Sequence, residues 1–319
     1  MGTGNFAMLE KLKDWKKTHV FKTEMPANAR AIWSVIGLMI VADAIGLKVQ
    51  GMSLVLHALI ANVAAISIIM GISFIYSCVR RSPRIAEMTH MMAILLAYTC
   101  SGAIASYIAA TVHRPLFDAQ LAAADRALGL NWIACYRWVA AHPHIEALFL
   151  TAYASLIPQL LFVIMMLNFK GFCARGWEVI WLFVVSCTGC LILSAIWPAA
   201  GAFGYYHIEA NRPYVQVFLG LHNGAIKIIG NQPIQGIIQF PSFHVALAIL
   251  LTYAARGFPI LFITFLEINI LLFLSTPAIG GHHFADLWGG VALALASIWL
   301  VRKVVSPRLG LDMTKVMEM

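Results

Sequence analysis

Two short stretches in the last third of the chain carry residue types suited to proton transfer and nucleophilic attack. They are residues 240–244 (FPSFH) and 275–286 (STPAIGGHHFAD). His282 and Asp286 are four positions apart, so on a helix they would share one face. A carboxylate that accepts from one imidazole nitrogen raises the basicity of the other nitrogen. The pattern therefore predicts a nucleophile, its orienting acid and, in His244, a second imidazole that donates a proton.

Elements that position these residues are suggested by the neighbouring amino acids. Pro241 suits the first turn of a helix, where its missing N–H has no partner to lose. Ser242 could cap that helix or donate to an anion, and His244 would lie in the first turn, where the helix dipole favours negative charge. The second stretch is expected to open a helix too, with Gly281 allowing close approach of the backbone to a ligand.

The composition defines the class of protein. Of the 319 residues, 61% are hydrophobic and 11% charged, and the mean hydropathy is +0.81. Soluble domains are about 45–50% apolar and about 25% charged. These numbers exclude a soluble enzyme, a nucleic-acid binder and a secreted disulfide scaffold. They predict an all-α, polytopic helical bundle in a membrane.

About eight apolar segments are long enough to cross the bilayer. They lie near residues 31–47, 54–79, 88–112, 145–169, 177–197, 237–255, 258–277 and 284–301. With both termini in the cytoplasm, only six of the 22 Lys and Arg residues fall on the other side, which agrees with the positive-inside rule. Both histidine stretches then lie at the extracytoplasmic or lumenal face, and we expect a plasma or inner membrane. We expect cytoplasmic tails at 1–30 and 305–319 around one catalytic domain, 31–304, with its core at 177–304.

The order FPSFH and then GGHHFAD resembles the type 2 phosphatidic acid phosphatase superfamily. The resemblance implies a metal-independent enzyme without a cofactor that acts on a lipid phosphate. It assigns His282 as the nucleophile that becomes phosphohistidine, Asp286 as its orienting partner and His244 as the acid that protonates the leaving group. Ser242 would bind a phosphate oxygen. No nucleic-acid partner is implied.

Two departures from the superfamily pattern concern its cations. Thr276 stands where the family has Arg, and Tyr107 and Tyr205 stand at the Lys positions of its K-x6-R-P motif. Phosphate charge must then be neutralised by other residues, and the available cations are Arg212, Lys227 and Arg114.

The stretch 114–129 and the form PSFH resemble the inositol phosphorylceramide synthase branch, which transfers a phospho-headgroup between lipids. The acceptor is accordingly water, a lipid hydroxyl or a polyol. Asp118 and Asp125 could accept from polyol hydroxyls. They lie at the edge of an expected interfacial helix whose apolar face comprises Phe117, Leu121, Ala124 and Leu128.

Other interpretations stay open at this point. His244, His282, His283 and Asp286 could instead ligate zinc. A lipid transporter would use the histidines as a proton relay, and a catalytically inactive lipid-binding scaffold would have lost one of the three residues. His283 occupies a position that is usually aromatic in the family, so we expect it to form a wall of the site.

Overall fold

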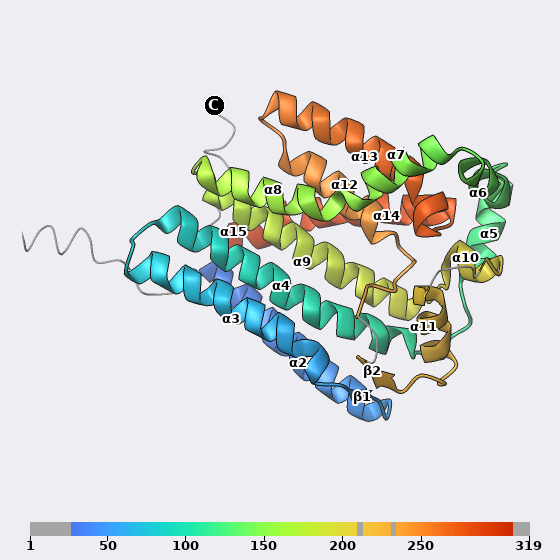
Figure 1. Ribbon diagram of the computed structural model, residues 1–319, viewed down its shortest axis with the longest axis horizontal. Helices are drawn as coiled ribbons and strands as arrows, with labels where there is room; N and C mark the ends of the chain where they lie inside the picture. Colours follow the sequence, from blue (N-terminus) through green and yellow to red (C-terminus); the bar gives the residue numbers. More distant parts are fainter. Residues whose placement is uncertain (1–26, 209–212, 231–233, 309–319) are drawn as a thin grey trace, which may run out of the picture.

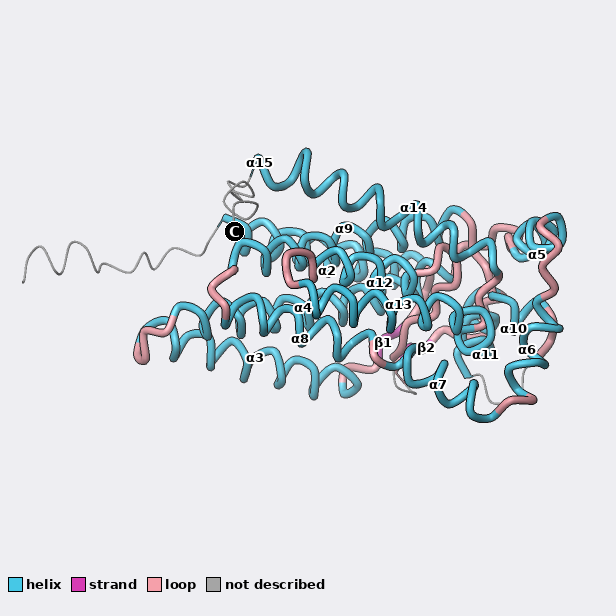
Figure 2. The backbone as a smooth tube through the Cα atoms, turned by 90° about the horizontal axis from the view of Figure 1, so that it is seen from above, coloured by secondary structure: helices cyan, strands magenta, loops and turns pink. Residues whose placement is uncertain are grey.

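The computed structural model describes residues 27–208, 213–230 and 234–308. Long helices run side by side along the molecule, and several short helices gather at one end (Figures 1 and 2). The helices are α2 (Ala27–Val49), α3 (His57–Cys78), α4 (Pro83–Ala110), α5 (Asp118–Ala127), α6 (Trp132–Ala140), α7 (Pro143–Ala154), α8 (Leu156–Phe169), α9 (Cys173–Ile196), α10 (Gly201–Tyr205), α11 (Pro213–His222), α12 (Phe243–Ala254), α13 (Pro259–Gly280), α14 (Phe284–Leu300), the π-helix η1 (Val301–Val305) and α15 (Ser306–Arg308). Strands β1 (Ser53–Leu54) and β2 (Ile228–Ile229) form one short parallel pair.

The bundle confirms the prediction of an all-α polytopic membrane protein. Within the described ranges, six helices are long and apolar enough to cross a membrane, and a seventh span is formed if α7 and α8, bent by 40°, are counted as one. The predicted count of eight is not confirmed, because α12 has only 12 residues. At 1.5 Å per residue it covers about 18 Å, less than a hydrocarbon layer of about 30 Å.

The short length of α12 follows from how the chain reaches it. Residues 234–242 contain no helix, yet Ile237, Gln239 and Ser242 are buried. Irregular backbone is tolerated at membrane depth where protein surrounds it. The apolar run predicted as a helix from 237 to 255 is therefore irregular chain up to residue 242 and helical only from Phe243, which leaves His244 in the first turn.

Helices α4, α9, α12 and α14 pack together in the middle of the bundle. Close contact between α12 and α14 depends on Gly290, since a Cβ there would lie 2.5 Å from the carbonyl oxygen of Ser242. The two histidine stretches are thereby joined at the starts of neighbouring helices. Helix α3 packs mainly on α4 and buries only Ser73, so it lies at the edge.

The two ends of the bundle differ in their connections. We call α5, α6, α10 and α11 the helical cap; they gather near the α13–α14 turn (Figure 1). The α3–α4, α8–α9 and α12–α13 turns lie at the other end, as does α15. The predicted domain boundaries stay predictions, because residues 1–26 and 309–319 lie outside the described part of the chain.

Candidate active site

The first histidine stretch forms the start of α12. Ser242 is the N-cap residue, and its hydroxyl oxygen accepts a hydrogen bond from the backbone N–H of Val245 at 3.4 Å. The capping alternative for Ser242 is thus seen directly, whereas its contact with phosphate stays a prediction. Pro241 does not take the predicted place in the first turn. It precedes the cap, because Ser242 is extended and fills the N-cap position.

His244 follows in the first turn of α12, as predicted. Its ring stacks on Tyr153 of α7, with ring centroids 4.3 Å apart. The Tyr153 hydroxyl lies 3.1 Å from Nδ1 of His244. One imidazole nitrogen is thereby engaged, and Nε2 is the nitrogen left to exchange a proton with a substrate. Sequence reasoning missed Tyr153, because it lies 91 positions away from His244 in the chain and belongs to neither motif.

The second stretch forms the turn between α13 and α14. Gly281 ends α13 in the left-handed region, at φ 71°. A Cβ on Gly281 would lie 2.1 Å from a ring carbon of Phe203 and 2.6 Å from the Tyr214 hydroxyl, so only glycine fits. Its carbonyl oxygen accepts the backbone N–H of Ala202 at 2.7 Å. In this structure the close approach that Gly281 permits is made by the helical cap; contact with a ligand stays a prediction.

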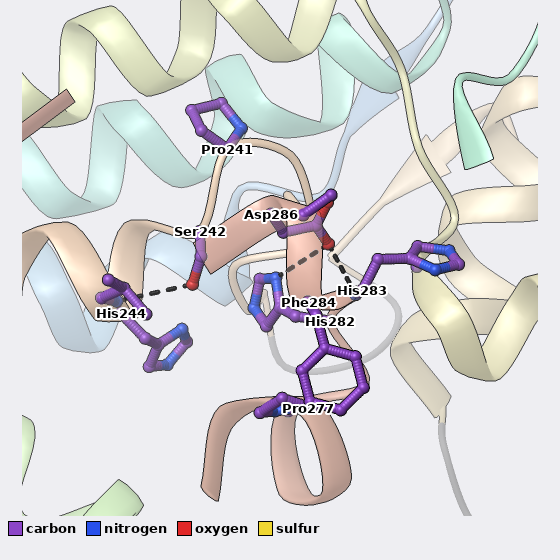
Figure 3. A network of polar contacts seen from close by, with 12 residues as sticks. Pro241, Ser242, His244, Pro277, His282, His283, Phe284 and Asp286 are labelled. Carbon is purple, nitrogen blue, oxygen red and sulfur yellow. Dashed lines mark hydrogen bonds and ion pairs between the residues drawn. The ribbon is translucent and has the colours of Figure 1, made fainter. Parts of the chain in front are cut away.

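His282 and Asp286 meet as predicted, but by another route. Nδ1 of His282 lies 3.4 Å from Oδ2 of Asp286, which is longer than an ordinary hydrogen bond. His282 is not on a helix, since His283 is the extended N-cap residue of α14. The pair forms because the Asp286 carboxylate turns back over the helix start and accepts the backbone N–H of His283 at 2.9 Å (Figure 3).

The two predicted catalytic imidazoles face each other across the site. Their ring centroids are 6.1 Å apart and the rings are nearly perpendicular. His282 is 1% exposed and Asp286 is fully buried. Since Nδ1 of His282 faces Asp286, its Nε2 is directed away from the carboxylate. The arrangement supplies an oriented imidazole and a second imidazole within reach of one bound group.

His283 points away from His282 (Figure 3). Its Nε2 lies 3.4 Å from Asp118, and its Nδ1 lies 3.5 Å from Asp125. Burial lowers the pKa of His283, but the nearby carboxylates of Asp118, Asp125 and Asp286 together raise it to about 9. His283 is therefore a buried cation at neutral pH. We expected His283 to form a wall of the site. Its ring contacts Tyr205 and Tyr206, but its two nitrogens face carboxylates of α5.

Asp118 and Asp125 are buried on one face of α5. Asp118 accepts backbone N–H groups from Ala200 and Gly201, at 2.9 and 2.8 Å. Asp125 accepts those of Phe284 and Ala285, at 3.1 and 2.8 Å. Binding of polyol hydroxyls by these carboxylates stays a prediction, while the contacts observed are with the protein itself.

The predicted apolar face of α5 is divided between the protein and its surface. Leu121 is buried, whereas Ala124 and Leu128 are exposed, and the predicted contact of this face with the membrane interface stays a prediction. The two carboxylates lie beside Leu121 on the buried side because they bind backbone N–H groups and His283.

Of the predicted phosphate-binding cations, the two in the described part of the chain make no hydrogen bond or ion pair with the histidines. Arg212 lies outside the described residues. Lys227 is exposed and precedes β2. Arg114 is exposed and donates to the carbonyl oxygen of Ile196 at 3.3 Å. Their roles stay predictions.

The zinc alternative requires three or more ligands around one point. In the described ranges, no group of three His, Cys, Asp or Glu side chains could hold a metal ion. His283 turns toward α5 rather than toward His244, which separates two of the four candidate ligands.

The fold and site define an integral membrane protein with two opposed histidines at a helix-capped end. The chain belongs to the PAP2 superfamily, whose family model matches residues 119–300. This confirms the resemblance at the level of the superfamily and makes the protein a phosphatase or phosphotransferase of lipid phosphates. No curated protein and no solved structure matches the chain. The inositol phosphorylceramide synthase branch stays a prediction.

Proposed function

We propose that this protein cleaves a lipid phosphoester through a phosphohistidine intermediate, without a metal or cofactor, at the extracytoplasmic face. The observation that carries the proposal is the pair of opposed imidazoles. Among the described residues, His282 has a carboxylate behind it and His244 has none. An imidazole oriented in this way acts as a nucleophile, and its partner without a carboxylate acts as a proton donor.

In the first step, Nε2 of His282 forms a bond to phosphorus while the bond from phosphorus to the leaving oxygen breaks. The leaving oxygen takes a proton from Nε2 of His244. Asp286 stabilises the positive charge that develops on His282. In the second step, an acceptor hydroxyl or water gives its proton to His244 and attacks phosphorus, and the bond to His282 breaks.

An apolar groove of about 420 Å³ supports a lipid substrate. It runs along α12 from Val245, the residue after His244, and is completed by side chains of α13 and α14 such as Phe262, Leu266 and Ile298. A phosphate held between the histidines would leave an attached hydrocarbon chain at the mouth of this groove.

Phosphate binding is assigned to Ser242, to the backbone at Gly281 and to Arg212, Lys227 and Arg114. The face of the membrane follows from the turns at the other end of the bundle. Those turns carry Arg80, Arg81, Lys170 and Arg256, and basic turns favour the cytoplasmic side. The histidines then open to the extracytoplasmic side.

Transfer of a phospho-headgroup to a lipid or polyol hydroxyl is the second candidate. The burial of His282 beneath the helical cap favours it, because a covalent intermediate shielded from water survives until another acceptor arrives.

Product analysis tests both candidates. The purified protein is given phosphatidate, an isoprenyl diphosphate or phosphatidylinositol in lipid micelles with a chelator, with or without ceramide and diacylglycerol. Products are resolved by mass spectrometry, with His282→Ala as the blank. Free phosphate without an acceptor identifies a phosphatase, and a new headgroup-bearing lipid only with an acceptor identifies a transferase. Activity in well-folded His282→Ala equal to that of the wild type contradicts the mechanism.

A further inference from the structure

Helix α5 reaches the catalytic turn through a buried row of three charged side chains. We propose that Asp118, His283 and Asp125, here called the charged latch, position the nucleophile by fixing the backbone on which His282 stands. The inference rests on the proposed role of His282. It gives His283 and the two carboxylates a positioning role and requires no contact with substrate.

Asp118 and Asp125 are spaced along α5 so that the ring of His283 fits between their carboxylates. Asp118 and Asp125 are seven residues apart, so they share a face of α5 about 10.5 Å apart along its axis. His283 lies between them, with one ring nitrogen directed at each carboxylate. A neutral imidazole has only one N–H, so both contacts are made as donors only by the protonated ring.

Each carboxylate also binds a different part of the site. Asp125 accepts the first two backbone N–H groups of α14, the helix that carries Asp286. Asp118 accepts the N–H groups at the start of α10. The next residue of α10, Ala202, donates its N–H to the carbonyl oxygen of Gly281. The latch therefore connects α5 to both sides of the turn that contains His282.

Other contacts leave the turn little freedom once the latch is closed. Trp132 of α6 donates from Nε1 to the carbonyl oxygen of His282 at 2.9 Å. The N–H of His283 is held by Asp286. With the backbone fixed on both sides, the direction of Nε2 of His282 is set by its side-chain torsions and by the contact of Nδ1 with Asp286. A displacement of about 1 Å in such a group costs on the order of a hundredfold in rate.

The protonation of His283 in the charged latch depends on the ionisable groups of all the elements packed around it. The ionisable groups that face or neighbour His283 are Asp118, Asp125 and Arg126 on α5, Tyr205 and Tyr206 at α10, and His282 and Asp286 in the turn. Carboxylates outnumber the cations that touch them, so His283 is held in its charged form. Loss of its proton leaves two buried carboxylates with only backbone donors.

The experiment compares Asp125→Asn, His283→Gln and the double variant Asp118→Asn/His283→Gln, which removes one charge of each sign. The control is His144→Gln, which replaces an exposed histidine on α7. Turnover is measured with dioctanoyl phosphatidate in micelles, and backbone amide exchange is measured by mass spectrometry. We expect kcat to fall tenfold to a hundredfold with KM within twofold, and amides 283–286 to exchange at least tenfold faster. His144→Gln changes neither.

Each outcome has one meaning. Faster exchange together with a lower kcat supports the latch, and so does a double variant that is more stable than His283→Gln. Unchanged exchange in folded Asp125→Asn overturns the latch, as does a rise in KM with kcat unchanged, which would place His283 against the substrate. Exchange does not depend on turnover, so full activity of His282→Ala would overturn the proposed mechanism and leave the exchange result standing.

Discussion

The two histidines of the site are held in different ways. The turn around His282 accepts a hydrogen bond from Trp132 of the helical cap and donates one to Asp286 of α14, and His282 is 1% exposed. His244 is partly exposed and contacts the ring and the hydroxyl of Tyr153. The group that forms a covalent bond is held from several sides, whereas among the described residues the group that moves a proton has one side-chain hydrogen-bond partner.

Of the substitutions that test this difference between the two histidines, we expect His282→Ala to reduce turnover the most. His282→Ala removes the atom that bonds to phosphorus, and the described residues place no other nucleophile against Asp286. We expect turnover to fall by about a thousandfold or more. Thermal unfolding of the purified variant in detergent should match that of the wild type within a few degrees. A loss of less than tenfold in folded protein would contradict the role of His282.

His244→Ala is expected to have the next largest effect, and the effect depends on the substrate. General acid catalysis contributes about a hundredfold to ten-thousandfold. An aryl phosphate whose leaving group departs without a proton should lose much less activity than an alkyl phosphate. Rates of both substrates in His244→Ala and His282→Ala separate the two roles. Equal losses on both substrates in His244→Ala would show that His244 is not the acid.

The charged latch predicts how stability depends on pH. The pKa of His283 is raised from 6.5 to about 9, so its stabilisation is complete below pH 6.5 and is lost as the pH rises through 9. This difference in pKa corresponds to a contribution by His283 of about 3 kcal/mol to the free energy of unfolding. We expect the melting temperature to fall between pH 6.5 and 9, and to fall less in His283→Gln. Parallel curves for the two proteins would contradict the charged state of His283.

Much of the fold and part of the site follow from the sequence. Apolar runs predict most of the helices, and the motif spacing predicts that His244, His282 and Asp286 converge. The start of α12 could not be placed, because an apolar segment looks the same in sequence whether it is helical or buried in extended form. The burial of Asp118 and Asp125 could not be predicted from periodicity, because their partners at residues 200–201 and 283–285 lie far away in the chain.

The smallest effect tests how loosely His244 is held. Tyr153→Phe keeps the stacked ring and removes only the hydroxyl near Nδ1 of His244. One hydrogen bond of this kind contributes about 1 kcal/mol, so we expect kcat to fall about fivefold. The loss should appear on the alkyl phosphate and nearly vanish on the aryl phosphate, because it acts through proton donation. Tyr136→Phe, which changes a tyrosine of α6 away from His244, is the matched control. An equal loss on both substrates would mean that Tyr153 acts on phosphate or on the fold, and that His244 needs no partner.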